Sequence, residues 1–282
     1  MRKNVLKRAT AALLGAVAIT LAAPALSASA DSTPTAAALQ SGQKLLPGQS
    51  LMSGESSLVM QGDGNLVLYL VGPTGAHGPA LWSSGTYGNR GAYAYMQPDG
   101  NLVVYRNGGS SPADALWSSR SWGHPGAFLS LYNGTLRVSA VDGTGTRWET
   151  HTGVAPTVSQ GGWHPETLIN SSRNVEPGQW IESNSVWLLN QPDGNLVLYR
   201  KRDGAALWSS RTWNHPASRV VVSDSRFDGA LRLENVQNGL TEWSIPVKGQ
   251  SGIYGKVQDD GNFVIYTGSG TALWSTGTWG KA

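Results

Sequence analysis

Five residue types recur in this sequence at a regular spacing of two. The pattern Gln-x-Asp-x-Asn-x-Val-x-Tyr occurs over residues 61–69, 97–105, 191–199 and 258–266. Because side chains on a β-strand alternate between its two faces, residues spaced by two point the same way. Each segment therefore predicts one face that carries amides, a carboxylate, a small apolar group and a phenol. Such a face can bracket a sugar ring and form hydrogen bonds with several of its hydroxyls.

A second repeat surrounds these segments. The sequence Ala-Leu-Trp-Ser, or a weaker copy of it, recurs around tryptophans that are 35 and then 31 residues apart in each half of the chain, and the halves are offset by 126 residues. Equal intervals in both halves predict a duplicated domain of three similar parts. We expect these tryptophans to join a core; they are Trp82, Trp117, Trp148, Trp208, Trp243 and Trp274.

The local sequence of each part is typical of strands joined by tight turns. Asp-Gly inside the motif predicts a turn, or equally a β-bulge at the glycine. In the first copy Leu66 and Leu68 alternate with Asn65, Val67 and Tyr69, so we expect the leucines to face a core and the other three side chains to remain accessible. No stretch has a sustained helical period, and the protein is therefore predicted to be all-β.

The N-terminal segment differs in composition from the rest. Basic residues are followed by an apolar stretch over residues 11–23, which is short for a bilayer span, and by Ala28-Ser29-Ala30. This order predicts a signal peptide over residues 1–30, cleaved after Ala30, rather than a membrane anchor. We expect a secreted protein with a flexible lead at 31–39, a first domain at 40–153, a connector at 154–166 and a second domain at 167–282.

Charge and composition exclude several classes of function. Removing the 4 basic residues of the signal peptide from the 21 Lys and Arg leaves 17, against 18 Asp and Glu, and there is no cysteine. A nearly neutral chain gives no support to a nucleic-acid partner. The histidines lack metal-ligand spacing, and no unique acidic pair, cysteine nucleophile or Ser-His-Asp signature indicates an enzyme. We predict no cofactor, no metal and no membrane insertion.

The repeated motif, in register with the Trp repeat, resembles the bulb-type mannose-binding lectins of monocots, over nearly the whole mature chain. The resemblance implies two tandem type II β-prism domains, each with three four-stranded sheets around a pseudo-threefold axis. In that family Asp and Asn contact the 2-hydroxyl of α-mannose, Gln the 3-hydroxyl and Tyr the 4-hydroxyl, while Val packs on the ring carbons. It also implies a possible exchange of the C-terminal strand near Trp274 between the domains.

Carried over position by position, the resemblance implies four carbohydrate sites. An ionised carboxylate forms a strong hydrogen bond to a hydroxyl, and a site that pairs one hydroxyl rejects an epimer that leaves it unpaired. The candidate residues are Gln61, Asp63, Asn65, Val67 and Tyr69; Gln97, Asp99, Asn101, Val103 and Tyr105; Gln191, Asp193, Asn195, Val197 and Tyr199; and Gln258, Asp260, Asn262, Val264 and Tyr266.

Two of the six parts depart from the motif. The third part has Leu131, Asn133, Thr135, Arg137 and Ser139 at the five positions, and the fifth has Arg226, Asp228, Ala230, Arg232 and Glu234. An arginine would occupy the place of the valine that touches the ring, so we predict that neither face binds mannose.

The function expected from these features is that of a secreted, multivalent, non-enzymatic lectin for mannose-type glycans. The tandem arrangement is also similar to the lectin-like bacteriocins, which recognise bacterial surface polysaccharide containing D-rhamnose, a 6-deoxy-D-mannose.

Another tryptophan lies five residues after three of the six repeated tryptophans. We predict that these residues pack against the protein rather than stack on a sugar: Trp122, Trp213 and Trp279.

Overall fold

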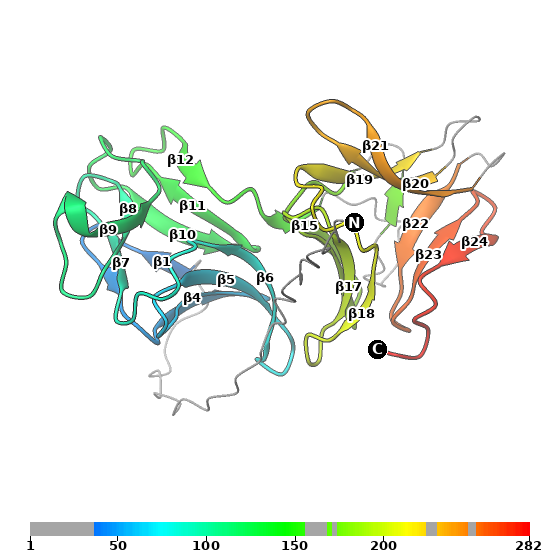
Figure 1. The fold of residues 1–282 in the computed structure, drawn as a ribbon, viewed down its shortest axis with the longest axis horizontal. Coiled ribbons are helices and arrows are strands. Elements are labelled where there is room, and N and C mark those ends of the chain that lie inside the picture. Colours follow the sequence, from blue (N-terminus) through cyan, green and yellow to red (C-terminus); the bar gives the residue numbers. More distant parts are fainter. Residues whose placement is uncertain (1–36, 156–167, 171–173, 224–229, 248–251) are drawn as a thin grey trace, which may run out of the picture. The chain divides into compact units, whose positions relative to one another are not determined.

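The structure is a computed structural model that describes residues 37–155, 168–170, 174–223, 230–247 and 252–282 (Figure 1). The predicted signal peptide and most of the predicted connector lie outside the described residues. Within the part of the chain that is described, no helix is long and apolar enough to cross a membrane. Apart from one turn of 3₁₀ helix, η1 (Pro112–Asp114), the regular structure of the described residues is β, which confirms the all-β prediction.

Three antiparallel sheets of four strands form the first half of the molecule. In the first two of these sheets the motif Val and Tyr lie on the third strand in spatial order, between the preceding strand of the hairpin and the Ala-Leu-Trp-Ser strand, whereas the motif Gln, Asp and Asn lie in the turn before that strand. The sheets are β3 (Ser50–Ser53), β4 (Ser56–Met60), β5 (Leu66–Val71) and β6 (His77–Ser83); β2 (Lys44–Leu45), β7 (Tyr93–Met96), β8 (Leu102–Tyr105) and β9 (Ala115–Ser118); and β1 (Ala37–Leu39), β10 (Phe128–Tyr132), β11 (Thr135–Ser139) and β12 (Thr146–Glu149).

The second half repeats this plan with different strand numbers. Its sheets are β13 (Gly153–Val154), β15 (Gln179–Glu182), β16 (Val186–Asn190), β17 (Leu196–Arg200) and β18 (Ala206–Ser209); β19 (Ser218–Ser223), β20 (Ala230–Asn235) and β21 (Thr241–Pro246); and β14 (Leu168–Asn170), β22 (Tyr254–Val257), β23 (Phe263–Tyr266) and β24 (Ala272–Ser275). The prediction of two three-sheet β-prism domains is confirmed, but four strands in every sheet is wrong here.

Two features explain the unequal strand numbers. The chain leaving the first half continues alongside the second, where β13 pairs in parallel with β15 and adds a fifth strand. In the three-stranded sheet, an isolated bridge between Val175 and Val220 stands where a fourth strand would pair. The boundary predicted between residues 153 and 154 therefore falls inside a strand, not at the start of a connector.

The predicted ends of the chain also need correction. The lead expected over residues 31–39 ends in a paired strand, because β1 forms a ladder with β10 in the third sheet of the first half. The strand near Trp274, β24, pairs with β23 of its own sheet. The exchange of that strand between domains is therefore not found in this structure.

The repeated tryptophans meet at the centre of each half. In the first half Trp82, Trp117 and Trp148 form three edge-to-face pairs with ring centroids 5.2–5.5 Å apart. In the second half Trp208 lies 6.2 Å from Trp243 and 5.7 Å from Trp274. All six pack against the two hydrophobic clusters, as the sequence predicts. One tryptophan from each sheet thus closes the centre of the prism, where edge-to-face contacts between rings are favourable.

Strand β16 belongs to both cores. Its residues are buried on both faces, because alternate side chains point in opposite directions. Val186 and Leu188 pack in the core of the second half, whereas Trp187 and Leu189 join the core of the first. Trp180 on β15 also joins the first core. The first sheet of the second half is therefore a wall between two cores, and the halves are packed together rather than linked loosely.

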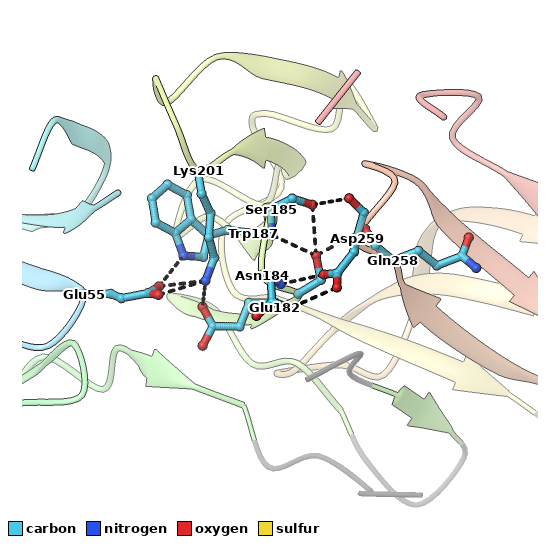
Figure 2. A network of polar contacts seen from close by, with 9 residues as sticks. Glu55, Glu182, Asn184, Ser185, Trp187, Lys201, Gln258 and Asp259 are labelled. Atoms are coloured by element: carbon cyan, nitrogen blue, oxygen red, sulfur yellow. Dashed lines mark hydrogen bonds and ion pairs between the residues drawn. The ribbon is translucent and has the colours of Figure 1, made fainter. Parts of the chain in front are cut away.

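A polar network continues this contact (Figure 2). The Lys201 ammonium is 2.8 Å from a Glu55 carboxylate oxygen and 2.7 Å from Glu182, and its side chain is only 6% exposed. Trp187 donates its indole N–H to Glu55 at 3.0 Å. Burial by itself raises the pKa of Glu55, but hydrogen bonds from Lys201 and Trp187 outweigh it and hold that pKa below its usual value. Glu55 of the first half is thus tied to two residues of the second.

Candidate functional site

Each of the four complete motifs begins with the same tight turn. The Gln carbonyl accepts from the Gly N–H three residues later, and the Gln N–H donates to the Asn carbonyl. The turn glycine has φ between +88° and +95° in all four copies, a region that other residues rarely adopt. The sequence left a turn and a bulge as alternatives at this glycine, and the structure has the turn. It brings the Asp and Asn side chains to the start of the motif strand.

The turn glycine is also required by its neighbours. A Cβ on Gly100 would lie 2.3 Å from the carbonyl oxygen of His124, and one on Gly194 would lie 2.0 Å from that of His215. In the first copy the Asn89 carbonyl approaches Gly64 equally closely. The loop that follows each Ala-Leu-Trp-Ser strand therefore rests directly on the motif turn.

Gln and Tyr at the two ends of the motif are joined by a hydrogen bond. The Gln side-chain amide donates to the Tyr hydroxyl at 2.9–3.0 Å in each complete copy. Since the phenol oxygen accepts this bond, its own O–H is not used by the Gln and can donate to another group. Burial raises the pKa of the Tyr69, Tyr105 and Tyr199 hydroxyls. These phenols therefore keep their proton at neutral pH.

Asp and Asn are arranged in the same way in all four copies. One Asp carboxylate oxygen accepts from the Asn backbone N–H at 2.9–3.0 Å. The Asn side-chain oxygen accepts from the loop after the Trp strand, as in the bond from the Thr86 N–H to Asn65 at 3.1 Å. Within the described residues, the second carboxylate oxygen and the Asn NH₂ group have no hydrogen-bond partner. An acceptor and a donor thus lie side by side and free for a ligand.

The strand shifts its register just before the Tyr. The shift falls between Leu68 and Tyr69 in the first copy and at the matching position in all six parts of the repeat. The extra residue lies on the Ala-Leu-Trp-Ser strand, because Leu68 pairs with Trp82 and Tyr69 with Ala80, and a bulge bends the strand that carries it. The motif strand keeps a regular ladder with the strand before it, so its Val and Tyr share one face. The two parts without the motif keep the bulge, so it belongs to the fold and not to the site alone.

The accessible face expected for Asn, Val and Tyr is only partly correct. The four motif valines are 2–4% exposed, and Tyr105 is 3% exposed, whereas the motif Asp residues are exposed. Tyr93 lies 5.9 Å from Tyr105 and packs with Val103 in a small cluster, which covers that phenol. The valine is therefore the floor of each site and the carboxylate is its rim.

A hydroxyl relay that the sequence reasoning missed supports the turns. In five of the six parts, two Ser or Thr hydroxyls two residues apart bond to each other at 2.6–2.7 Å. The first accepts from a backbone N–H of the motif strand, and the second donates to the turn glycine carbonyl. The signal is Trp-x-Ser/Thr-x-Ser/Thr, and the pairs are Ser84 and Thr86, Ser119 and Ser121, Thr150 and Thr152, Ser210 and Thr212, and Thr276 and Thr278.

The prediction that Trp122, Trp213 and Trp279 pack against the protein is wrong. Their exposed fractions are 58%, 53% and 73%. Each of them comes directly after the residue that carries the second hydroxyl of the relay, at the start of a loop. Their indole rings face solvent.

The third part of the first half has a different site chemistry. Arg137, at the valine position, forms a 2.9 Å ion pair with Glu149, which also contacts His151 at 3.0 Å. An open pocket of about 630 Å³ lies over this face and is also lined by Glu176, Pro177 and Gln179 of the second half. A Cβ on Gly134 would lie 2.2 Å from the Trp180 ring. This face lacks the motif and instead forms part of the contact between the two halves.

The fifth part also lacks the motif. Arg226 and Asp228 lie outside the described residues. Glu234, at the Tyr position, pairs with Arg219 at 2.5 Å and with Arg232 at 3.7 Å. Ion pairs occupy the places of the valine and the phenol, so the Gln–Tyr bond and the apolar floor of the other sites are both replaced. Among the described residues, no group of three or more acidic or histidine side chains could hold a metal ion.

Segments of this chain are similar in sequence to known lectins. No family model matches the chain. It is 44% identical over 68 residues to a mannose-specific lectin of Narcissus pseudonarcissus, covering 24% of this chain and 57% of that protein. It is 39% identical over 75 residues to the B-type lectin plumieribetin of Scorpaena plumieri, covering 26% and 60%. The chain thus spans little more than half the length of these curated relatives, and over such segments it is similar to a mannose-specific lectin and a B-type lectin.

Two solved lectin structures are similar to this chain. The snowdrop (Galanthus nivalis) agglutinin, complexed with methyl α-D-mannoside, is 33% identical, with 38% of this chain and 91% of that chain covered and a TM-score of 0.32. The two-domain, fetuin-binding agglutinin of Scilla campanulata is 23% identical, with 85% of this chain and 100% of that chain covered and a TM-score of 0.32.

Proposed function

We propose that this protein is a secreted, multivalent lectin that binds mannose-type glycans through four sites, one on each complete motif. The observation that carries the proposal is the same hydrogen-bonded arrangement of Gln, Asp, Asn and Tyr in all four copies. The named relatives are lectins, not enzymes. Secretion rests on the signal-peptide pattern of residues 1–30, and N-terminal sequencing of exported protein should begin at Asp31.

The arrangement suits a hexopyranose with an axial hydroxyl. The free carboxylate oxygen and the Asn NH₂ accept from and donate to one hydroxyl, the Tyr O–H donates to a second, and the Gln amide orients that phenol. An epimer with the hydroxyl on the other side would leave a carboxylate and an amide unpaired, which is costly for polar groups that lose water on binding. The motif thus selects configuration more strongly than it selects size.

Several weak sites would act together. A shallow site with few contacts binds a monosaccharide at the mM level, worth about 4 kcal/mol. Two or more such sites on one rigid body can gain avidity of ~10²–10⁴ on a glycan surface. The shared core of the two halves makes the body rigid. We expect agglutination or tight binding to mannan together with weak binding of the free sugar.

The test is binding of mannose-type and D-rhamnose-type glycans by the mature protein and by a variant with Asp63, Asp99, Asp193 and Asp260 each changed to Asn. Asn keeps an oxygen that accepts from the backbone N–H but removes the charge. Because hydrogen bonds to charged groups are stronger than neutral ones, we expect each site to lose about tenfold in affinity. The matched control changes Asp142 to Asn, since Asp142 also caps a turn but lies outside the motifs.

The outcomes separate the functions that share this chemistry. Mannan binding that the four Asn substitutions abolish and Asp142→Asn leaves intact supports the lectin proposal. A preference for D-rhamnose, together with killing of related bacteria, would assign the same sites to a bacteriocin-like role. No glycan bound by the folded wild-type protein would mean that the motif serves only the fold.

A further inference from the structure

An exposed aromatic residue stands beside each complete motif. Tyr87, Trp122, Trp213 and Trp279 lie five residues after the central tryptophan of their parts, and 53–73% of each is exposed. Large aromatic side chains contribute most to stability when buried. Four of them left in solvent at the same place in the repeat therefore need an explanation outside the fold.

The aromatic residue is found with the motif and not with the fold. In the third part, which lacks the motif, Gly153 occupies this position, and in the fifth part Lys248 does. The third part nevertheless keeps the bulge and the hydroxyl relay. The aromatic side chain is thus dispensable for the strands and the relay, and it accompanies the residues proposed to bind sugar.

The backbone holds the aromatic residue between two anchors on the site. In the second copy, the N–H of Ser121 donates to the Asn101 side chain at 3.2 Å, and the N–H of His124 donates to the Asp99 carbonyl at 2.9 Å. Trp122 lies between these two bonds. Its Cα is therefore one residue, about 3.8 Å, from the Cα of a residue that is bonded to the site.

The other copies repeat this clamp. The residue before the aromatic donates to the motif Asn at 3.1–3.3 Å in each. After Trp213 and Trp279, the N–H groups of His215 and Gly280 donate to the carbonyls of the motif Asp residues at 3.2 and 2.8 Å. After Tyr87, the Asn89 carbonyl lies against the turn glycine. The backbone of each aromatic residue is therefore fixed beside the turn that carries the exposed carboxylate.

We propose that these four aromatic residues form a second subsite beside each lectin site, on which the neighbouring pyranose of a mannose-type oligosaccharide stacks the apolar C–H face of its ring. This inference rests on the proposed function and extends it from a monosaccharide to a glycan chain. A contact with a second copy of this protein explains the pattern less well. The four residues follow strands of four different sheets, whereas one protein interface requires a contiguous patch.

The test compares methyl α-mannoside with α-linked mannotriose by calorimetry. The wild-type protein is measured beside a variant in which Tyr87, Trp122, Trp213 and Trp279 are all Ala. Contacts of an aromatic ring of this kind contribute about two- to tenfold in affinity per site. We expect the wild type to prefer the trisaccharide by that factor, and the variant to bind both sugars as the wild type binds the monosaccharide.

Two controls separate stacking from a structural effect. Tyr132→Ala removes a tyrosine that is 59% exposed on the third sheet of the first half, and it should leave the preference unchanged. A variant with Phe at the four positions should restore most of it, because a ring is present again. Thermal unfolding at the wild-type temperature would show that the Ala variant is folded.

Each result decides a different point. A variant that keeps the wild-type preference for the trisaccharide, or loses both sugars equally while folded, overturns the subsite but not the lectin. A wild-type protein that binds neither sugar overturns the proposed function and this inference with it. Loss of self-association in the Ala variant, with the sugar preference intact, would assign the rings to contacts between copies.

Discussion

At the scale of single residues, the site depends on glycines that no other residue can replace. Gly100 has φ +94° and a carbonyl oxygen 2.3 Å from the place of a Cβ, whereas Gly123 has φ +87° and nothing within 4 Å. Gly123→Ala should cost about 1–2 kcal/mol of unfolding free energy from backbone strain alone. Gly100→Ala should cost about 3 kcal/mol or more, because the His124 loop must also move. Urea unfolding of both variants measures the difference, and equal losses would contradict the crowding argument.

Residue spacing predicted the repeated architecture but not the local structure around each motif. The period of two placed only the motif Val and Tyr correctly on strands, because the Gln, Asp and Asn lie in the turn that precedes each strand. The equal Trp intervals predicted two domains of three sheets. Burial of the valines was missed, because a residue on the binding face of a strand can still be covered by its neighbours across the sheet. The outward direction of Trp122 was missed because a bulky apolar residue ordinarily packs inward; here no element lies over its loop.

At the scale of elements, one carboxylate adds a side-chain link across the sheet with three strands, beside its backbone ladders. Glu242 on β21 accepts hydrogen bonds from Ser218 on β19 and from Asn235 on β20, the latter at 3.0 Å, and lies 3.2 Å from His215. The bond from Ser218, with the others, lowers the pKa of Glu242. A single side chain therefore links all three strands of the sheet.

This link makes stability depend on pH. A carboxylate with a lowered pKa in the folded state stabilises the protein above its unfolded pKa, and that stability is lost as the pH falls through the folded value. The wild-type urea midpoint should therefore fall between pH 5 and pH 3 more steeply than that of Glu242→Gln. Parallel curves for the two proteins would show that Glu242 makes no such contribution.

The junction between the halves explains why the third face of the first half lacks the motif. The third face of the first half contacts Trp180 and the start of β15, so its turn serves the junction instead of a ligand. No sequence pattern announces such a junction, because it depends on residues more than forty positions away. The loss of the motif was predicted, but its reason required the structure.

At the scale of the whole molecule, the two halves behave as one body because they share a core and a charge network. Lys201 is almost fully buried between Glu55 and Glu182, and it lies over the Trp187 ring at 5.4 Å. Burial raises the pKa of Glu182, with a further increase from nearby Glu55, against the effect of Lys201. The cation is therefore what allows two carboxylates to face each other across the junction.

Replacing this cation should weaken the junction in a way that depends on pH. Lys201→Met leaves two carboxylates without a counter-charge, and we expect a loss of about 2 kcal/mol at pH 7, below the value for a fully buried pair because Glu55 is half exposed. Protonation relieves the repulsion, so the deficit should shrink as the pH falls toward 4. Urea unfolding at both pH values measures it, with Glu55→Gln/Lys201→Met as the control that restores part of the stability. A stability deficit independent of pH would mean that the variant loses packing and not a charge interaction. An unchanged stability would mean that the junction depends on Trp180, Trp187 and Leu189 alone.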